Sequence, residues 1–249
     1  MNRKCFFLIP AAGSGTRMGT GQPKLMRNVE GRPVILRTLG AIADVCRDHY
    51  AGMDYKIILV TTQDLIDLLK AMCSEYFPDI SITYTLGGST RTEAVSNGLN
   101  MINDADDDDF VLVHDGARCL VTAEEIKACI DGLKDHDVCA SAVPVKNTLK
   151  EVEILPSGDV KVTDTPDRTR FYEILTPQGF KFKDIETCYM RAMDDGITAT
   201  DDTALATRYG LEVFLTKGLY SNLKITTPED IAFASEIVRS RGESEPFHD

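Results

Sequence analysis

The sequence has no apolar run long enough to cross a membrane. A membrane-spanning helix needs roughly 18 or more consecutive apolar residues, and no stretch of this chain approaches that length. Residues 1–4 lead directly into a short apolar run, without the separate apolar region and small-residue cleavage site of a secretory signal peptide. We therefore expect a cytoplasmic protein without a membrane partner.

The sequence also lacks the spacings with which histidine and cysteine bind metals. The four histidines have no metal-ligand spacing, and the seven cysteines include no Cys-x-x-Cys pair, so we expect no metal held by protein ligands. The odd number of widely spaced cysteines predicts buried free thiols in a reducing compartment. Residues 104–109 are rich in aspartate but lack the spacing of an EF-hand, which favours a solvated loop.

Positive charge is scarce in this chain. It contains 27 lysines and arginines against 39 aspartates and glutamates, which gives a net charge of −12 at pH 7. A charge of this sign argues against nucleic acid or an anionic membrane as a partner. An anionic substrate would therefore have to be bound by a few placed cations rather than by a basic surface.

The chain shows a regular alternation of strand-like and helix-like segments. This alternation predicts an α/β fold with a mostly parallel, twisted sheet and helices on both faces. No repeat or linker divides the chain, so we expect one domain over residues 1–240 and a flexible polar tail over 241–249. The predicted strands are residues 4–10, 56–61, 81–86, 110–115, 138–145, 173–175 and 212–216, and the predicted helices include 33–47, 63–76, 92–102, 123–134 and 202–209.

Helix ends carry specific signals. Thr122 with Glu125 three residues later predicts a capping box. Thr227 before Pro228 combines a helix N-cap with a proline at the first helical position. Gly210 is expected to end the preceding helix. These signals fix the boundaries of three predicted helices.

Residues 146–172 break the alternation. Val152–Ile154 and Val160–Val162 alternate apolar and polar residues around Pro156–Asp159, which predicts a β-hairpin. A hairpin is marginally stable by itself in water, so this one should pack against something. We therefore predict an arm over about residues 147–172 that projects from the sheet, with a second subunit as the candidate surface.

The most informative motif follows the first predicted strand. Between Ile9 and Gly19, three glycines allow the backbone to approach an anionic group and to turn its N–H groups toward that group. Arg17 and Lys24 add two cations within reach. The strand, the glycine loop and the cations together predict a polyphosphate-binding site, whereas a tight turn with incidental basic residues is the structural alternative.

Two familiar polyphosphate motifs do not match this loop. A P-loop needs Gly-Lys followed by serine or threonine, whereas Lys24 stands between Pro23 and Leu25. The dinucleotide fingerprint needs Gly-x-Gly-x-x-Gly, whereas the last glycine here comes one residue later. The next predicted strand also ends without a carboxylate placed for a ribose. A nicotinamide-dependent oxidoreductase is therefore disfavoured.

Ligands in an open α/β sheet bind beyond the carboxyl ends of its strands. Glycine-rich or charged groups follow several predicted strands there. Each group alone could be structural, such as an ion pair between Asp115 and Arg118, but their number at one edge favours a ligand site. Besides the glycine loop, the groups are Gly87–Arg91, His114–Arg118, Pro144–Thr148 and Asn222–Pro228.

This ordered set resembles the 2-C-methyl-D-erythritol 4-phosphate cytidylyltransferases of the non-mevalonate isoprenoid pathway, within the wider glycine-loop nucleotidyltransferases. The similarity runs from about residue 6 to residue 237, nearly the whole chain. The motifs that carry it are Ala11–Met18, Pro23-Lys24, Gly87-Gly88 with Arg91, His114–Arg118, Asp167-Arg168, Leu175–Gln178, Thr200–Asp202 and Asn222–Asp230.

The resemblance implies a reaction in which CTP and 2-C-methyl-D-erythritol 4-phosphate give 4-diphosphocytidyl-2-C-methyl-D-erythritol and pyrophosphate. A substrate phosphate oxygen attacks the α-phosphorus of CTP, so catalysis is mainly in-line positioning and charge stabilisation. The resemblance further implies a Rossmann-like nucleotidyltransferase fold, Mg²⁺ carried mainly by the CTP phosphates, and a homodimer formed through the arm.

The resemblance also implies roles for individual residues. The catalytic set is Arg17, Lys24, Arg168 and Lys224, of which Arg168 would reach the site of a neighbouring subunit. The substrate-binding set is Arg118, Thr148, Arg168, Thr176 and Lys224. The nucleotide-binding set is Ala11, Ala12, Gly13, Ser14, Gly15, Gly88, Arg91, Asp115 and Gly116.

The chain departs from the usual family pattern at three positions. Ala94 stands where serine is usual, so a hydroxyl contact near the nucleotide is missing. Cys119 replaces a proline and Asn147 replaces an aspartate. None of these changes removes a charge from the proposed transition-state site, but Ala94 bears on the affinity and base selectivity of nucleotide binding.

Two alternatives stay open. Cytidylyltransferases of ribitol 5-phosphate, or of another polyol phosphate, share the glycine loop and Lys24, although the arm motif Thr165–Tyr172 favours methylerythritol phosphate. A catalytically silent, nucleotide-binding relative would keep the fold, but such relatives usually lose the charged residues that are intact here.

Overall fold

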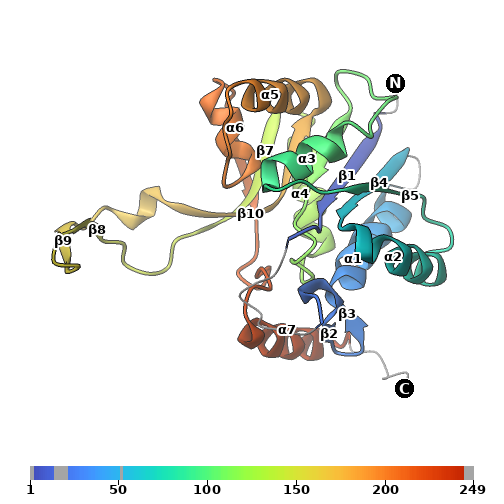
Figure 1. The fold of residues 1–249 in the computed structure, drawn as a ribbon, viewed down its shortest axis with the longest axis horizontal. Coiled ribbons are helices and arrows are strands. Elements are labelled where there is room, and N and C mark those ends of the chain that lie inside the picture. The colour runs from blue at the N-terminus through green and yellow to red at the C-terminus, as the bar shows by residue number, and fades with distance from the viewer. Residues whose placement is uncertain (1–2, 14–21, 51–52, 244–249) are drawn as a thin grey trace.

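A seven-stranded sheet lies at the centre of the computed structural model, which describes residues 3–13, 22–50 and 53–243 (Figure 1). The strand order is β11-β7-β10-β6-β1-β4-β5, and β10 is antiparallel to both of its neighbours whereas the other pairs are parallel. The mostly parallel α/β sheet predicted from the sequence is therefore confirmed. The strands are β1 (Cys5–Pro10), β4 (Tyr55–Thr61), β5 (Ile82–Leu86), β6 (Phe110–Val113), β7 (Val138–Pro144), β10 (Tyr172–Lys181) and β11 (Phe214–Lys217).

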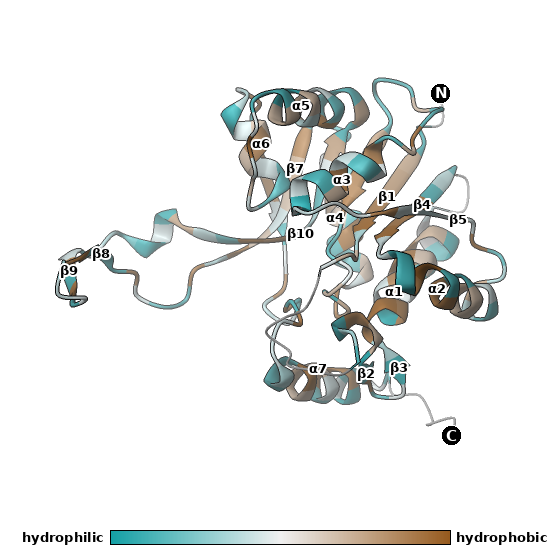
Figure 2. Ribbon diagram, in the orientation of Figure 1, coloured by the Kyte–Doolittle hydropathy of each residue, from teal (hydrophilic) through white to brown (hydrophobic). Residues whose placement is uncertain are grey.

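Helices cover both faces of the sheet because successive side chains of a strand point to opposite faces. In β1, Phe7 and Ile9 pack with α1, α2, α4 and α7, whereas Phe6 and Leu8 pack with α3, α5 and α6. Strand β1 is accordingly apolar along its length (Figure 2), and so is β6. The helices are α1 (Val34–His49), α2 (Gln63–Tyr76), α3 (Arg91–Leu99), α4 (Ala123–Gly132), α5 (Phe182–Asp194), α6 (Asp202–Arg208) and α7 (Pro228–Arg241).

The three helix-end signals are confirmed. Thr122 and Glu125 form a capping box at α4, and Thr227 and Asp230 form another at α7. Gly210, with φ of +86°, follows the end of α6 in the left-handed region that glycine tolerates. The elements before α1 are short: η2 (Lys24–Met26), β2 (Asn28–Val29) and β3 (Arg32–Pro33).

The sequence underestimated the length of β10, an interior strand of the sheet. Residues 173–175 are only the first part of β10, which continues to Lys181. Pro177 removes a ladder donor and therefore disguises a central strand in the sequence pattern. The strand accommodates the proline through an irregularity in its pairing with β7 between Ile174 and Gln178. Helix α5, which follows directly, was not among the predicted helices.

The predicted hairpin arm is confirmed. Strands β8 (Glu151–Ile154) and β9 (Val160–Asp164) pair in antiparallel fashion, and the arm projects far from the sheet (Figure 1). A short helix, η3 (Arg168–Arg170), lies between β9 and β10. Val152 pairs with Val162 and Ile154 pairs with Val160, so one face of the hairpin is apolar. All four side chains are exposed in the described chain.

Several smaller expectations can also be compared with the structure. All seven cysteines are buried and free, as predicted. The aspartates of residues 104–109 are exposed except for Asp109, whose buried carboxylate accepts the backbone N–H of Lys4 and of Asp106. In the described part of the chain, no helix has the length and apolar character needed to cross a bilayer. The division into a domain over 1–240 and a tail over 241–249 stays a prediction.

Candidate active site

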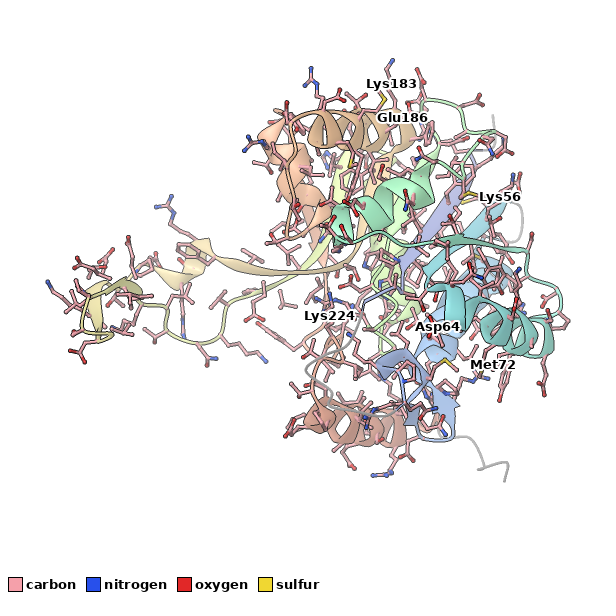
Figure 3. All side chains as sticks on the ribbon, in the orientation of Figure 1. Lys56, Asp64, Met72, Lys183, Glu186 and Lys224 are labelled. Carbon is pink, nitrogen blue, oxygen red and sulfur yellow. The ribbon has the colours of Figure 1, made fainter. Side chains whose placement is uncertain are left out.

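A cavity of about 470 Å³ opens beyond the carboxyl ends of β1 and β6, at the edge where the sequence predicts a ligand site. Residues far apart in the chain meet there because these strands end side by side. Lys224 lies on the segment that runs from the sheet to α7 (Figure 3). The predicted site residues that line the cavity are Ala11, Ala12, Gly13, Lys24, Gly88, Arg91, Asp115 and Lys224.

The remaining predicted residues lie elsewhere. Ser14, Gly15 and Arg17 lie outside the described residues. Gly116, Arg118 and Thr176 do not line the cavity but contact residues that do: the N–H of Gly116 donates to the carbonyl oxygen of Pro10, and Arg118 and Thr176 both contact Asp115. The arm residues Thr148 and Arg168 are exposed and are not part of the cavity of their own chain.

Asp115 is the electrostatic centre of the cavity. Its carboxylate oxygens lie 2.9 Å from Lys224 Nζ, 3.3 Å from Arg118 Nε and 3.8 Å from Arg91 Nε. Burial by itself raises the pKa of Asp115, but these three cations outweigh burial and lower the pKa to about 2. Asp115 is therefore an anion throughout the physiological pH range.

Arg118 and Lys224 are held by a buried polar network. Arg118 Nη1 donates to the carbonyl oxygen of Asn222 at 2.8 Å, and Asn222 Nδ2 donates to the carbonyl oxygen of Thr176 at 2.9 Å. Asn222 Nδ2 also donates to Glu125 Oε1 at 3.0 Å. The loop that leads to Lys224 is therefore tied to β10 and to α4.

Glu125 has a positioning role that the sequence did not reveal. It is buried and completes the capping box of α4, because its Oε2 accepts the backbone N–H of Thr122 at 3.0 Å. Its other oxygen accepts the backbone N–H of Leu219 at 3.0 Å as well as the amide of Asn222. One carboxylate thus fixes both the start of a helix and the loop before Lys224.

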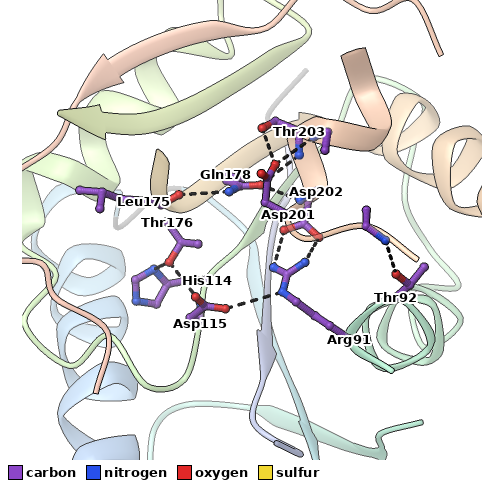
Figure 4. A network of polar contacts seen from close by, with 12 residues as sticks. Arg91, Thr92, His114, Asp115, Leu175, Thr176, Gln178, Asp201, Asp202 and Thr203 are labelled. Atoms are coloured by element: carbon purple, nitrogen blue, oxygen red, sulfur yellow. Dashed lines mark hydrogen bonds and ion pairs between the residues drawn. The ribbon is translucent and has the colours of Figure 1, made fainter. Parts of the chain in front are cut away.

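His114 is a neutral structural histidine. Thr176 Oγ1 accepts the backbone N–H of Asp115 at 3.2 Å, so we assign its own hydrogen to His114 Nδ1, 2.9 Å away (Figure 4). The Nε2–H then donates to the carbonyl oxygen of Arg118 at 3.2 Å. Burial lowers the pKa of His114 to about 4. This arrangement fixes the 114–118 turn that presents Asp115 and Arg118.

The turn before α3 is shaped by two glycines. A Cβ at Gly87 would lie 2.3 Å from Ala12 Cβ, and a Cβ at Gly88 would lie 2.3 Å from Glu93 Cβ. Glu93 Oε2 accepts both the backbone N–H and the hydroxyl of Ser89, at 2.6 and 2.7 Å. The turn is therefore closely packed, and Gly88 exposes only backbone to the cavity.

Arg91 is bound by a residue to which the sequence assigned no role. Its guanidinium makes a two-pronged contact with the buried carboxylate of Asp202 (Figure 4). Asp202 belongs to the Thr-Asp-Asp motif, which supplied the sequence signal, but its partner could not be read from the sequence. Among the described residues, no group of three or more His, Cys, Asp or Glu side chains is placed to hold a metal ion.

Comparison with known proteins shows the family of this chain. Residues 5–240 match the family model for 2-C-methyl-D-erythritol 4-phosphate cytidylyltransferase. A protein of that name from Nostoc sp. is 37% identical over 247 residues, covering 96% of this chain and 100% of the relative. Another from Bacillus velezensis is 35% identical, covering 94% of this chain and 95% of the relative.

A solved structure gives the same result. The crystal structure of 4-diphosphocytidyl-2C-methyl-D-erythritolsynthase from Anaerococcus prevotii superposes with a TM-score of 0.80 at 31% identity, covering 96% of this chain and 100% of that chain. Sequence and structure therefore match over nearly the whole length of the chain. This chain belongs to the 2-C-methyl-D-erythritol 4-phosphate cytidylyltransferase family.

Proposed function

We propose that this enzyme transfers CMP from CTP to 2-C-methyl-D-erythritol 4-phosphate, giving 4-diphosphocytidyl-2-C-methyl-D-erythritol and pyrophosphate. The observation that carries the proposal is the cavity at the sheet edge, where Lys24, Arg91 and Lys224 lie with Asp115 in a chain of this family. The protein as a whole has a charge of −12, so these cations supply the local positive field that two phosphorylated substrates require.

The reaction needs positioning and charge stabilisation rather than a protein nucleophile. A phosphate oxygen of the acceptor attacks the α-phosphorus of CTP, and the bond to the β-phosphate breaks as pyrophosphate leaves. Lys24, together with Arg17, neutralises the charge that builds up at the α-phosphate. Lys224 binds the acceptor phosphate, and the permanently anionic Asp115 accepts hydrogen bonds from substrate or ribose hydroxyls. The closely packed backbone at Gly88 contacts the nucleotide.

The cavity fits a Mg²⁺ ion that arrives with the nucleotide. Mg²⁺ usually binds substrate phosphates and one or two carboxylates while it keeps several waters. Of the described residues that line the cavity, Asp115 supplies the carboxylate, and three cations already face it. This donor set fits an ion held mainly by the CTP phosphates, for which Asp115 would supply the protein oxygen. When bound, the ion neutralises phosphate charge.

The arm supports a homodimer. Its apolar face is exposed, with Ile154 at 75% and Val160 at 63%, and a hairpin of this size needs a packing partner. A second copy of the chain would cover this face and would receive Arg168 and Thr148 in its own cavity. A cytoplasmic location is supported by the seven buried cysteines, which are all free thiols.

Pyrophosphate release tests the proposed reaction. Purified enzyme receives Mg²⁺ and CTP with either methylerythritol 4-phosphate or ribitol 5-phosphate, and Lys24→Ala is the control variant. We expect release with methylerythritol 4-phosphate and a loss on the order of 100–1000-fold in the variant. Release with ribitol 5-phosphate alone would overturn the acceptor, and CTP binding without release from either acceptor would favour a silent relative.

A further inference from the structure

A buried ion pair stands behind one wall of the cavity. Arg91 lines the cavity, and its Nη1 and Nη2 lie 2.7 and 2.6 Å from the two carboxylate oxygens of Asp202 (Figure 4). The Arg91 side chain is 23% exposed, whereas that of Asp202 is 0% exposed. A single fork-shaped contact therefore connects the cavity wall with the protein interior.

The Asp202 carboxylate is itself fixed by neighbouring elements. The hydroxyl of Tyr189 in α5 donates to Asp202 Oδ1. Burial and the adjacent carboxylate raise the pKa of Tyr189, so this hydroxyl keeps its proton. Gln178 in β10 accepts the backbone N–H groups of Asp202 and Thr203 at 2.9 and 3.1 Å, and its own amide donates to the carbonyl oxygen of Leu175. Asp202 cannot shift without breaking contacts to α5 and β10.

The start of α3 has a second connection to the same region. Thr92 Oγ1 accepts the backbone N–H of Ala199 at 3.1 Å. Two successive residues of α3, Arg91 and Thr92, are therefore attached to the segment that begins α6 (Figure 4). These contacts fix the position of the helix start and the direction in which the Arg91 side chain leaves it.

Arg91 lies near two carboxylates, those of Asp115 and Asp202, and it is hydrogen-bonded to Asp202. Its Nε lies 3.8 Å from Asp115 Oδ1, beyond hydrogen-bonding distance, whereas both Nη atoms are engaged by Asp202. Without Asp202, the guanidinium would be drawn to Asp115, which already faces Lys224 and Arg118. Arg91 would then neutralise Asp115 instead of presenting its remaining N–H groups to the cavity.

We infer that Asp202 is a positioning residue for nucleotide binding: it holds the Arg91 guanidinium against the cavity wall, with its remaining N–H groups directed at CTP. The inference rests on the proposed function. The alternative is a purely structural link between α3 and α6. A buried ion pair, however, commonly gives little net stability compared with apolar residues of similar volume, so stability is a weak reason for this pair.

Calorimetric titration of CTP in the presence of Mg²⁺ and without the acceptor tests the inference. The variants are Asp202→Asn, Tyr189→Phe, Arg91→Ala and the double variant Arg91→Ala/Asp202→Asn. The matched control is Glu30→Gln, which makes the same carboxylate-to-amide change at the pair between Glu30 and Arg239, where Nη2 lies 2.7 Å from Oε1 and Nε lies 3.0 Å from Oε2. Thermal unfolding of each variant is recorded in parallel.

We expect Asp202→Asn to weaken CTP binding on the order of tenfold, the usual size for a lost contact to a charged group. Tyr189→Phe should weaken it by about twofold to threefold, and Glu30→Gln should leave it unchanged. The double variant should bind no more weakly than Arg91→Ala, because Asp202 acts through Arg91.

Three results would overturn the inference. These are unchanged CTP affinity in a folded Asp202→Asn variant, losses that add up in the double variant, or an equal loss in Glu30→Gln. If Asp202→Asn does not fold, Tyr189→Phe decides: weaker binding supports the inference and unchanged binding overturns it. Failure of the wild-type protein to bind CTP would instead overturn the proposed function.

Discussion

The cavity and the arm both carry charged residues of the proposed site, but those of the cavity are buried or half-buried whereas those of the arm are exposed. In the cavity, Asp115 is 10% exposed and faces three cations, and Arg91 is held by a completely buried carboxylate. On the arm, Arg168 is exposed and its side chain donates to the carbonyl oxygen of Lys146, while the apolar side chains of β8 and β9 face solvent. The described chain therefore fixes the cavity half of the proposed site by its own contacts, whereas the arm half is completed only in the homodimer that we propose.

The strongest test of this difference is complementation between two inactive variants. Lys24→Ala removes a cation from the cavity, and Arg168→Ala removes one from the arm. Each should lower the rate of pyrophosphate release on the order of 100–1000-fold, because each removes charge stabilisation from the reaction. If the arm serves the partner's cavity, one site of each mixed dimer contains both wild-type residues.

Mixing the two variants, with exchange of subunits by dilution and concentration, should restore about one quarter of the wild-type activity, since half of the dimers are mixed and each has one intact site. Activity is measured against mixing ratio, and either variant mixed with itself is the control. No recovery in mixtures that contain mixed dimers would show that Arg168 acts within its own chain or not at all.

Apolar residues of the two regions should respond differently to substitution. Leu112 in β6 is completely buried, so Leu112→Ala should lower the free energy of unfolding by about 2–5 kcal/mol. Ile154→Ser on the arm should change the stability of the isolated chain by less than about 0.5 kcal/mol and should weaken dimerisation. Urea unfolding at low protein concentration and analytical ultracentrifugation separate the effects. Equal losses of chain stability would contradict the distinction between the two regions.

The free energy of unfolding should depend on pH through His114, which is buried in the turn beside the cavity, and not through the exposed arm. Burial lowers the pKa of His114 from 6.5 to about 4. Between pH 6.5 and about 4, the unfolded chain therefore binds a proton at this histidine that the folded chain does not bind. The corresponding stabilisation is fully present above about pH 6.5 and is lost as the pH falls toward about 4, by roughly 3 kcal/mol.

Urea unfolding at several pH values checks this loss, with His114→Gln as the comparison. In that variant, the slope of the free energy of unfolding against pH should decrease between pH 6.5 and 4 by the equivalent of about one proton. An identical slope in wild type and variant would show that His114 does not titrate as its burial implies.

The smallest expected effect concerns the cavity wall. Ala94 lines the cavity and is 5% exposed, at a position where the family resemblance of the sequence implies a serine. Ala94→Ser should lower the KM for CTP by about threefold, which is the size of one neutral hydrogen bond, and should leave that for UTP unchanged. Steady-state kinetics with both nucleotides measures the change. An equal change for both would exclude a contact specific to cytosine.

The sequence predicted the parts of this molecule that depend on local pattern. Most of the strands, the capping box at Thr122, the helix start at Thr227 and the hairpin turn with Gly158 follow from periodicity and turn chemistry. The cavity edge followed from the rule that ligands of an open α/β sheet bind beyond the carboxyl ends of its strands. These inferences use residues close together in the chain or a general rule of α/β sheets.

The parts that were missed depend on contacts between distant residues. Glu125 reads as an ordinary capping residue, yet its second oxygen holds residues almost one hundred positions later, Leu219 and Asn222. Asp202 likewise binds Arg91 across 111 positions. Neither partner can be chosen from spacing. Pro177 hid a central strand because the pattern of the ladder is interrupted at that residue.

The seven buried cysteines provide built-in probes of how this protein opens. They lie in both layers of the core, from Cys5 and Cys139 in the sheet to Cys73 in α2 and Cys188 in α5. Burial raises the pKa of Cys139 and of Cys188 to about 11, so neither thiol reacts while it remains enclosed. The order in which a thiol reagent labels them would show which layer of the core separates first. The experiment needs no additional cysteines, because the native ones already lie in both layers.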